Sequence, residues 1–242
     1  MKDALLDDRH KKIIFVLHSQ GGIEGSLVID WLLAELPRDV LRKLEVYTFG
    51  NAANHFSNPR SSLRQERHAK VIPHIEHYAN TGDFVAQWGV SNFIRLPNRY
   101  MGRLFERRAT GHLLNQHYLD HMFPLNSEST ACANSNAFME SGIEISDSSA
   151  TYTLLQPSSS SESVDRAVLI NMHSPIKSSK IGTDGQGDGR PKVKHFSRLW
   201  GYRNGMLPFD APTIELEQDI SAEKAALKTK MIRTRHKNRM SM

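Results

Sequence analysis

The amino-acid sequence predicts an α/β fold of about four mostly parallel strands with flanking helices, followed by a long polar tail. Up to Leu125, short apolar runs rich in β-branched and aromatic residues alternate with amphipathic stretches. This alternation is typical of strand–helix–strand units in a parallel sheet. After Asn126 the composition shifts to Ser, Asn, Asp and Gly, which bury too little apolar surface to offset the entropy of ordering.

The first predicted unit covers residues 13–49. Residues 13–17 are apolar on both faces, as expected for a buried strand, and the run 18–22 ends it. A helix is predicted over 23–36, where apolar residues recur at helical spacing before Pro37 stops it. Residues 44–49 form the second predicted strand.

The remaining elements are shorter. Residues 54–70 are polar and rich in Arg and His, so we expect a surface excursion. The further elements predicted are a strand at 75–79, a helical turn at 84–90, a strand at 99–107 and a helix at 113–122.

Three regions follow from this pattern. Residues 1–125 form the packed domain, and residues 126–194 are predicted to be a Ser-rich disordered linker. Residues 195–242 form a C-terminal segment that is partly docked through its aromatic residues and ends in a basic helix or tail.

Composition limits the location and the partners. One cysteine allows no internal disulfide or cysteine-based zinc site, and we find no signal peptide and no apolar stretch of about 20 residues. These features favour a cytoplasmic location and predict no transmembrane segment. The basic run 224–239 lacks interleaved aromatic residues, so nucleic-acid binding is not expected, and peripheral membrane contact stays open. Oligomeric state is not indicated.

The chemistry is predicted at Ser19, in the run His18-Ser19-Gln20-Gly21-Gly22. Ser-x-Gly by itself is weak evidence, but here it lies between a buried strand and an apolar helix. A sharp turn at this point lifts the serine hydroxyl above the carboxyl edge of the sheet. It also directs the backbone N–H of Gln20 toward a developing oxyanion.

The run 18–22 resembles the nucleophile elbow of α/β-hydrolases, especially lipase- and esterase-like members. The segments 47–53 and 111–119 are similar to fungal lipase-like hydrolases, and the resemblance covers about residues 12–125. One position departs, because Leu17 stands where the family pattern has its first glycine. The resemblance implies the C-terminal half of an α/β-hydrolase sheet and a nucleophile, acid and histidine in chain order: Ser19, Asp83 and His112.

Each of these residues has an ordinary structural alternative. Ser19 could be a helix N-cap, and Asp83 could be a turn or cap residue. His117 is the alternative catalytic histidine. His117 and His121 also have metal-ligand spacing, but no third ligand accompanies them, so neither a metal nor a cofactor is expected.

The predicted function is hydrolysis of a small acyl ester or lipid by Ser-His-Asp catalysis. The resemblance implies further strands before the nucleophile strand, which supply a second oxyanion donor, whereas only residues 1–11 precede it here. The sequence therefore predicts an incomplete oxyanion hole, in a fragment or an inactive relative. The alternative function is a non-catalytic interaction protein that uses the hydrolase scaffold and the basic tail.

Overall fold

The computed structural model describes residues 1–59, 70–146, 167–170 and 192–208. These residues belong almost entirely to the first of two compact units, Met1–Met206. In the second unit, Leu207–Met242, only residues 207 and 208 are described, so the predicted basic end lies outside the described residues.

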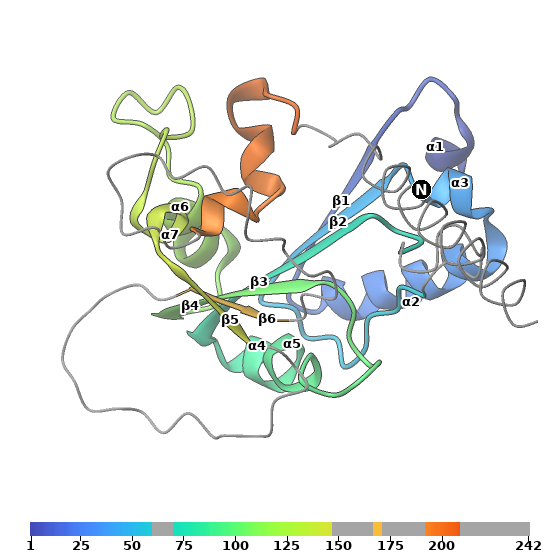
Figure 1. Ribbon diagram of the computed structural model, residues 1–242, viewed down its shortest axis with the longest axis horizontal. Coiled ribbons are helices and arrows are strands. Elements are labelled where there is room, and N and C mark those ends of the chain that lie inside the picture. Colours follow the sequence, from blue (N-terminus) through green and yellow to red (C-terminus); the bar gives the residue numbers. More distant parts are fainter. Residues whose placement is uncertain (60–69, 147–166, 171–191, 209–242) are drawn as a thin grey trace, which may run out of the picture. The chain divides into compact units, whose positions relative to one another are not determined.

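Six strands form one sheet in the order β1-β2-β3-β4-β6-β5 (Figure 1). The strands are β1 Ile13–His18, β2 Leu44–Phe49, β3 His74–Gly82, β4 Arg103–Thr110, β5 Ile143–Ser146 and β6 Ala167–Ile170. Strands β1 to β4 pair in parallel, β6 pairs antiparallel with β4, and β5 pairs in parallel with β6. The prediction of an α/β fold with about four mostly parallel strands is confirmed.

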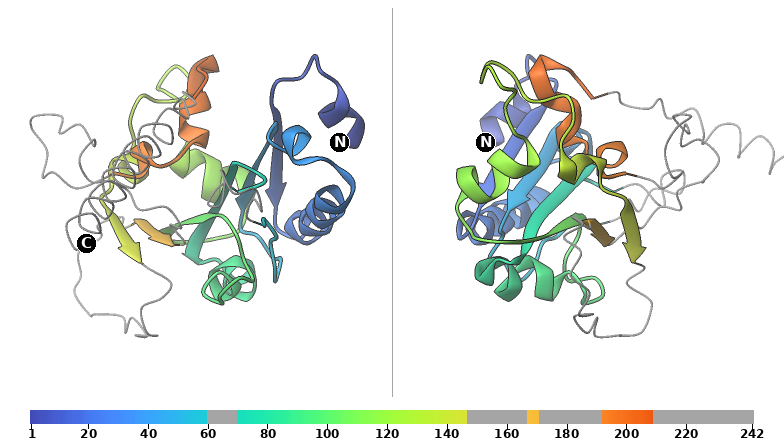
Figure 2. Two further views of the ribbon diagram at one scale, coloured as in Figure 1. Left: turned by 45° about the vertical axis from the view of Figure 1, so that its right-hand side comes forward. Right: turned by 90° about the vertical axis from the view of Figure 1, so that its left-hand side faces the viewer.

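Helices lie on both faces of the sheet (Figure 2). They are α1 Lys2–Leu6, α2 Gly21–Glu35, α3 Arg38–Leu41, α4 Phe84–Trp88, α5 Val90–Phe93, α6 Asp120–Met122 and α7 Ala137–Glu140. One buried cluster joins α2, α4 and α5 to the strands through residues such as Ile29, Ala86 and Val90. A second cluster, on the face of Tyr47 and Tyr78, holds the packed side chains of α6, α7 and the C-terminal turns.

Two predicted elements differ from those observed. The fourth strand begins at Arg103 rather than at residue 99, because Tyr100 pairs with Phe56 and Gly102 turns the chain at φ 121°. The predicted helix at 113–122 is a π-helix, η1 Leu114–Leu119, followed by α6. Helix α2 begins and ends within two residues of the prediction.

The predicted disordered linker at 126–194 is wrong for its first part. Residues 126–146 contain α7 and β5, because Asn136 caps α7 and the buried Phe138 and Met139 anchor it to the second cluster. Strand β6 also lies within this range. Residues 147–166 and 171–191 lie outside the described residues, including the predicted run of four serines.

The C-terminal turns η3 Val193–His195 and η4 Leu199–Gly205 dock against the sheet near the start of β2 and β3. The guanidinium of Arg198 donates to the Glu45 carboxylate at 2.8 and 2.9 Å. The backbone N–H groups of Arg198 and Leu199 donate to Glu76 at 2.8 and 3.2 Å. Two buried carboxylates therefore hold residues that are more than 120 positions away along the chain.

Among the helices of the described ranges, none combines the length and the apolar character needed to cross a membrane.

Candidate active site

Ser19 lies on a strained turn between β1 and α2. Its φ is 56°, a left-handed conformation that costs a non-glycine residue roughly 1–2 kcal/mol. Backbone hydrogen bonds hold it there, since Ser19 donates its N–H to Phe49 and accepts from Gly22 and Ala52. A strained residue that the surrounding backbone fixes is characteristic of functional sites.

The bulk of Leu17 is accommodated by a glycine on the helix. Leu17 is buried, and a Cβ on Gly25 would lie 2.3 Å from its side chain. Gly22, one turn earlier, leaves similar room for the buried side chain of Asn51. The sharp turn therefore forms with leucine at the position where the family pattern has glycine, because α2 lacks side chains where it faces the elbow.

The Ser19 hydroxyl faces His112, which follows β4. The distance from Ser19 Oγ to His112 Nε2 is 2.7 Å. Helix α2 begins with Gln20 as its N-cap residue and makes no side-chain cap hydrogen bond, so the Ser19 hydroxyl is not an N-cap. Gln20 is exposed, and its backbone N–H donates to no other group in the described ranges. That N–H stands at the N-terminus of a 15-residue helix, where the helix dipole favours negative charge.

The opposite side of the His112 ring faces Asp83, at the end of β3. His112 Nδ1 lies 2.9 Å from Asp83 Oδ2 and 3.0 Å from Oδ1. Asp83 is also the N-cap of α4 and accepts from the backbone N–H groups of Val85 and Ala86. Asp83 therefore both caps α4 and contacts His112, because different lone pairs of its carboxylate accept the two sets of hydrogen bonds.

Three residues that the sequence did not single out complete the surroundings of His112. His18 stacks on the His112 ring at 4.7 Å and donates from Nε2 to the His112 backbone oxygen at 2.7 Å. Tyr118 donates its hydroxyl to Asp83 at 2.5 Å. Gly50, at φ 51°, leaves the space where Asp83, His112 and Tyr118 meet. All three lie inside the runs 18–22, 47–53 and 111–119. The resemblance of these runs to hydrolases was the one sequence signal that could have indicated the three residues.

The alternative histidine, His117, is engaged elsewhere. Its Nδ1 accepts the backbone N–H of Leu113 at 2.9 Å, and its ring packs over Gly111, whose φ is 91°. The structure therefore brings His112, and not His117, to Ser19. Across the part of the chain that the structure describes, no group of three or more His, Cys, Asp or Glu side chains could hold a metal ion.

Apolar side chains are exposed next to each member of the Ser19–His112–Asp83 set. Phe84 directly follows Asp83 and packs on Trp88, with ring centroids 4.1 Å apart. Ile23 lies in the first turn of α2, and Leu113 directly follows His112. These four side chains are between 43 and 69% exposed, and each lies within five residues of a member of the set along the chain.

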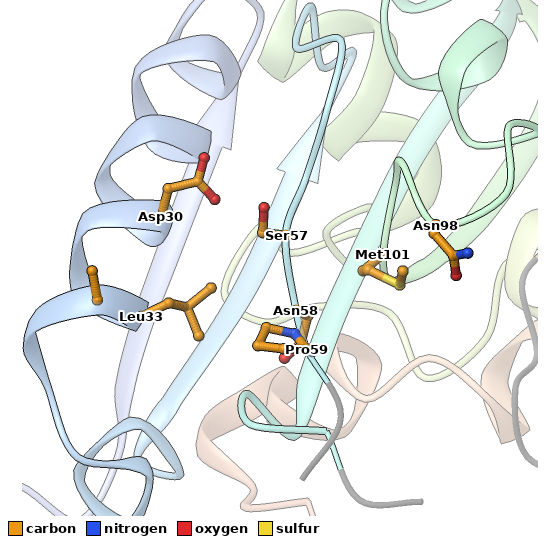
Figure 3. Close-up of a pocket in the computed structure, with 8 residues that line it drawn as sticks. Asp30, Leu33, Ser57, Asn58, Pro59, Asn98 and Met101 are labelled. Atoms are coloured by element: carbon orange, nitrogen blue, oxygen red, sulfur yellow. The ribbon is translucent and has the colours of Figure 1, made fainter. Parts of the chain in front are cut away.

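A pocket of about 460 Å³ lies elsewhere, between the second half of α2 and two loops (Figure 3). It is lined by Asp30, Leu33, Ala34, Ser57, Asn58, Pro59, Asn98 and Met101. Asp30 is 11 residues beyond Ser19, about 16 Å along a helix at 1.5 Å per residue. The Asp30 carboxylate is also bonded to His55 at 2.8 Å. The pocket therefore does not contain the Ser19–His112–Asp83 set.

Comparisons with known proteins add no family to this geometry. A scan against protein-family models, a search of the curated proteins and a search of the solved structures each found no match. The functional argument therefore depends on the arrangement of the residues themselves.

Proposed function

We propose that this protein is a serine hydrolase that cleaves acyl esters, with Ser19 as nucleophile, His112 as base and Asp83 as the acid that orients His112. The observation that carries the proposal is the continuous hydrogen-bonded set from Ser19 Oγ through His112 to Asp83, at a serine held in a strained turn. Nucleophile, base and orienting group in hydrogen-bonding reach of one another are the signature of an activated serine.

In the proposed mechanism Ser19 Oγ attacks the acyl carbon while His112 Nε2 takes its proton. Asp83 stabilises the resulting imidazolium through Nδ1–H. The oxyanion of the tetrahedral intermediate accepts from the Gln20 N–H at the start of α2. His112 then gives the proton to the departing alcohol, which leaves an acyl-serine. Water hydrolyses this ester with His112 again acting as base.

The surroundings favour a substrate that carries an apolar acyl group. Such a substrate is a small ester or a lipid. The exposed apolar residues Ile23, Phe84, Trp88 and Leu113 lie within five residues of Ser19, Asp83 or His112 along the chain. An acyl chain that covers these side chains removes apolar surface from water, which is worth roughly 25 cal/mol per Å². Substrates with longer acyl chains are therefore expected to react faster than acetate esters.

A fluorophosphonate probe tests the proposal, because such probes label only activated serines. The expected result is labelling of Ser19, found by peptide mass spectrometry and abolished in Ser19→Ala. Ser26→Ala is the matched control, because Ser26 lies on α2, the helix that follows Ser19, and its buried hydroxyl donates to the backbone oxygen of Ile23. A folded protein that is not labelled at Ser19 would overturn the proposal and favour the non-catalytic interaction protein.

A further inference from the structure

The hydroxyl of Tyr118 is the one side-chain donor, besides His112, that reaches Asp83 in the described part of the chain. Tyr118 lies on the π-helix η1, six residues after His112, and is fully buried. Its hydroxyl is 2.5 Å from Asp83 Oδ2, the same oxygen that lies 2.9 Å from His112 Nδ1. Tyr118 therefore contacts the orienting carboxylate directly, whereas the Ser19 hydroxyl is hydrogen-bonded to His112.

The hydrogen-bond pattern fixes the direction of this bond. The Tyr118 oxygen accepts the backbone N–H of Asn80 at 3.2 Å, so the single hydroxyl proton is left for Asp83. Burial and the neighbouring Asp83 raise the pKa of Tyr118 above its ordinary value, which keeps the hydroxyl protonated. The hydroxyl is thus held as a donor to Asp83.

The site is shaped so that these groups meet closely. A Cβ on Gly50 would lie 2.6 Å from Asp83 Oδ2, 3.0 Å from His112 Nδ1 and 3.0 Å from the Tyr118 oxygen. Asp83 Oδ1 is anchored by the backbone N–H groups of Val85 and Ala86, so Tyr118 supplies the side-chain anchor for Oδ2. With both oxygens held, the carboxylate keeps its plane toward the imidazole.

We propose that Tyr118 is a positioning residue of this site, which holds Asp83 so that His112 keeps its Nε2 directed at Ser19. The inference rests on the proposed hydrolase function and extends it to a fourth side chain. Tyr118 differs in this role from Tyr47 and Tyr78, the other buried tyrosines of the same face. Their hydroxyls donate to Glu45 and Glu76, nearer the amino ends of the strands.

The test is Tyr118→Phe, which removes the hydroxyl and keeps the ring. Loss of a hydrogen bond to a charged group should lower kcat for a p-nitrophenyl ester about 10- to 100-fold. KM should change by less than about threefold, because Tyr118 does not touch the substrate. The rate of fluorophosphonate labelling at Ser19 should fall in parallel with kcat.

Tyr78→Phe is the matched control. Tyr78 is equally buried, and its hydroxyl also donates to a carboxylate, Glu76 Oε2 at 2.8 Å, at the other end of the sheet. Both variants should lose similar stability in urea unfolding, whereas only Tyr118→Phe should lose kcat. A kcat of Tyr118→Phe within about threefold of the unmodified protein, or an equal loss in Tyr78→Phe, would overturn the inference.

A second readout does not need turnover. The proton between His112 Nδ1 and Asp83 should give a low-field NMR resonance, which would be assigned by its loss in His112→Gln. This resonance should shift or broaden in Tyr118→Phe and stay unchanged in Tyr78→Phe. An unlabelled Ser19 with this NMR pattern would refute the hydrolase and retain the positioning role. An unchanged resonance in Tyr118→Phe would refute the positioning role, whatever the activity.

Discussion

The two ends of the central strands carry similar groups in different arrangements. At the carboxyl ends, the buried Asp83 meets a tyrosine hydroxyl and the imidazole of His112, whose side chain is 30% exposed. Near the amino ends, the buried Glu45 meets the hydroxyls of Tyr47 and Tyr202 and the guanidinium of Arg198, which is 8% exposed.

The two ends differ in the basic side chain that contacts the buried carboxylate, which is an imidazole at one end and a guanidinium at the other. An imidazole exchanges protons near neutral pH, whereas a guanidinium stays charged at any pH a protein meets. His112 also has a second nitrogen, which faces Ser19. The carboxyl end can therefore pass a proton, whereas the amino end works as a permanent ion pair that fastens the C-terminal turns. A change at one end should alter reactivity, and a change at the other should alter stability.

The largest expected effect is that of Asp83→Asn on reactivity. Asparagine has a similar size and also caps helices well, so α4 and the fold should persist. In a Ser-His-Asp set this exchange stabilises the wrong imidazole tautomer and lowers turnover about 10⁴-fold. The measurement is the rate of Ser19 labelling, with Glu76→Gln as the control at the other end. Equal rates in the two variants would contradict the comparison.

Arg198→Ala should have the second largest effect, on stability. It removes one of the two cations that contact the fully buried Glu45, while Lys12 Nζ stays 3.1 Å from the carboxylate. The loss should therefore fall below the about 3–5 kcal/mol that breaking a buried pair from one side costs. Urea unfolding measures this loss. The labelling rate per folded molecule should match that of the unmodified protein, and a loss of labelling without unfolding would show that the two ends are coupled.

Much of the arrangement at the carboxyl ends of the strands could be predicted from the sequence, because strand ends are local signals. The apolar run before Ser19 and the strand before Asp83 place both residues at one sheet edge without any long-range information. The choice of His112 over His117 could not be made this way, because it depends on the turn at Gly111 and on the ring packing there.

The other end was not predictable, because its contacts join residues far apart in the chain. Glu45 and Arg198 are 153 positions apart, and no pattern in either segment specifies the other. One clue was present: Glu45 and Glu76 each directly follow an apolar residue within a strand, and a buried carboxylate needs a partner. The structured residues 126–146 were missed for a similar reason, since polar composition hid the few apolar anchors such as Phe138.

Acid should destabilise the protein through buried histidines in the middle of the sheet. Burial lowers the pKa of His77 to about 4, although the hydrogen bond to the Met101 oxygen opposes the shift. The unfolded chain takes up this proton near pH 6.5, so the contribution is complete above pH 6.5 and is lost as the pH falls toward 4. At one pKa unit per 1.36 kcal/mol, the loss is about 3 kcal/mol.

Urea unfolding at several pH values measures this slope. Burial also lowers the pKa of His74 to about 4, so both residues act in the same pH range. His77→Gln should flatten the slope between pH 6.5 and 4. Below that range Glu45 contributes, because its hydrogen bonds outweigh burial and lower its pKa to about 2. An unchanged slope in His77→Gln would contradict the assignment.

Gly50→Ala should have the smallest effect and gives the most direct test of how closely the reactive end is packed. The added methyl group would meet Asp83 Oδ2 at 2.6 Å and His112 Nδ1 at 3.0 Å, so these groups must move apart. Misplacing a catalytic group by a fraction of an ångström should lower the labelling rate about 10- to 100-fold. The positive φ adds roughly 1–2 kcal/mol of destabilisation.

Gly205→Ala separates these two contributions. Gly205 also has a positive φ, 74°, but a Cβ there meets nothing within 4 Å. It should show the destabilisation by urea unfolding and keep the labelling rate. If Gly50→Ala also kept its rate, the contact between Asp83 and His112 would tolerate displacement. Reactivity would then depend on the Ser19–His112 contact alone, and the difference between the two ends of the sheet would reduce to the choice of imidazole over guanidinium.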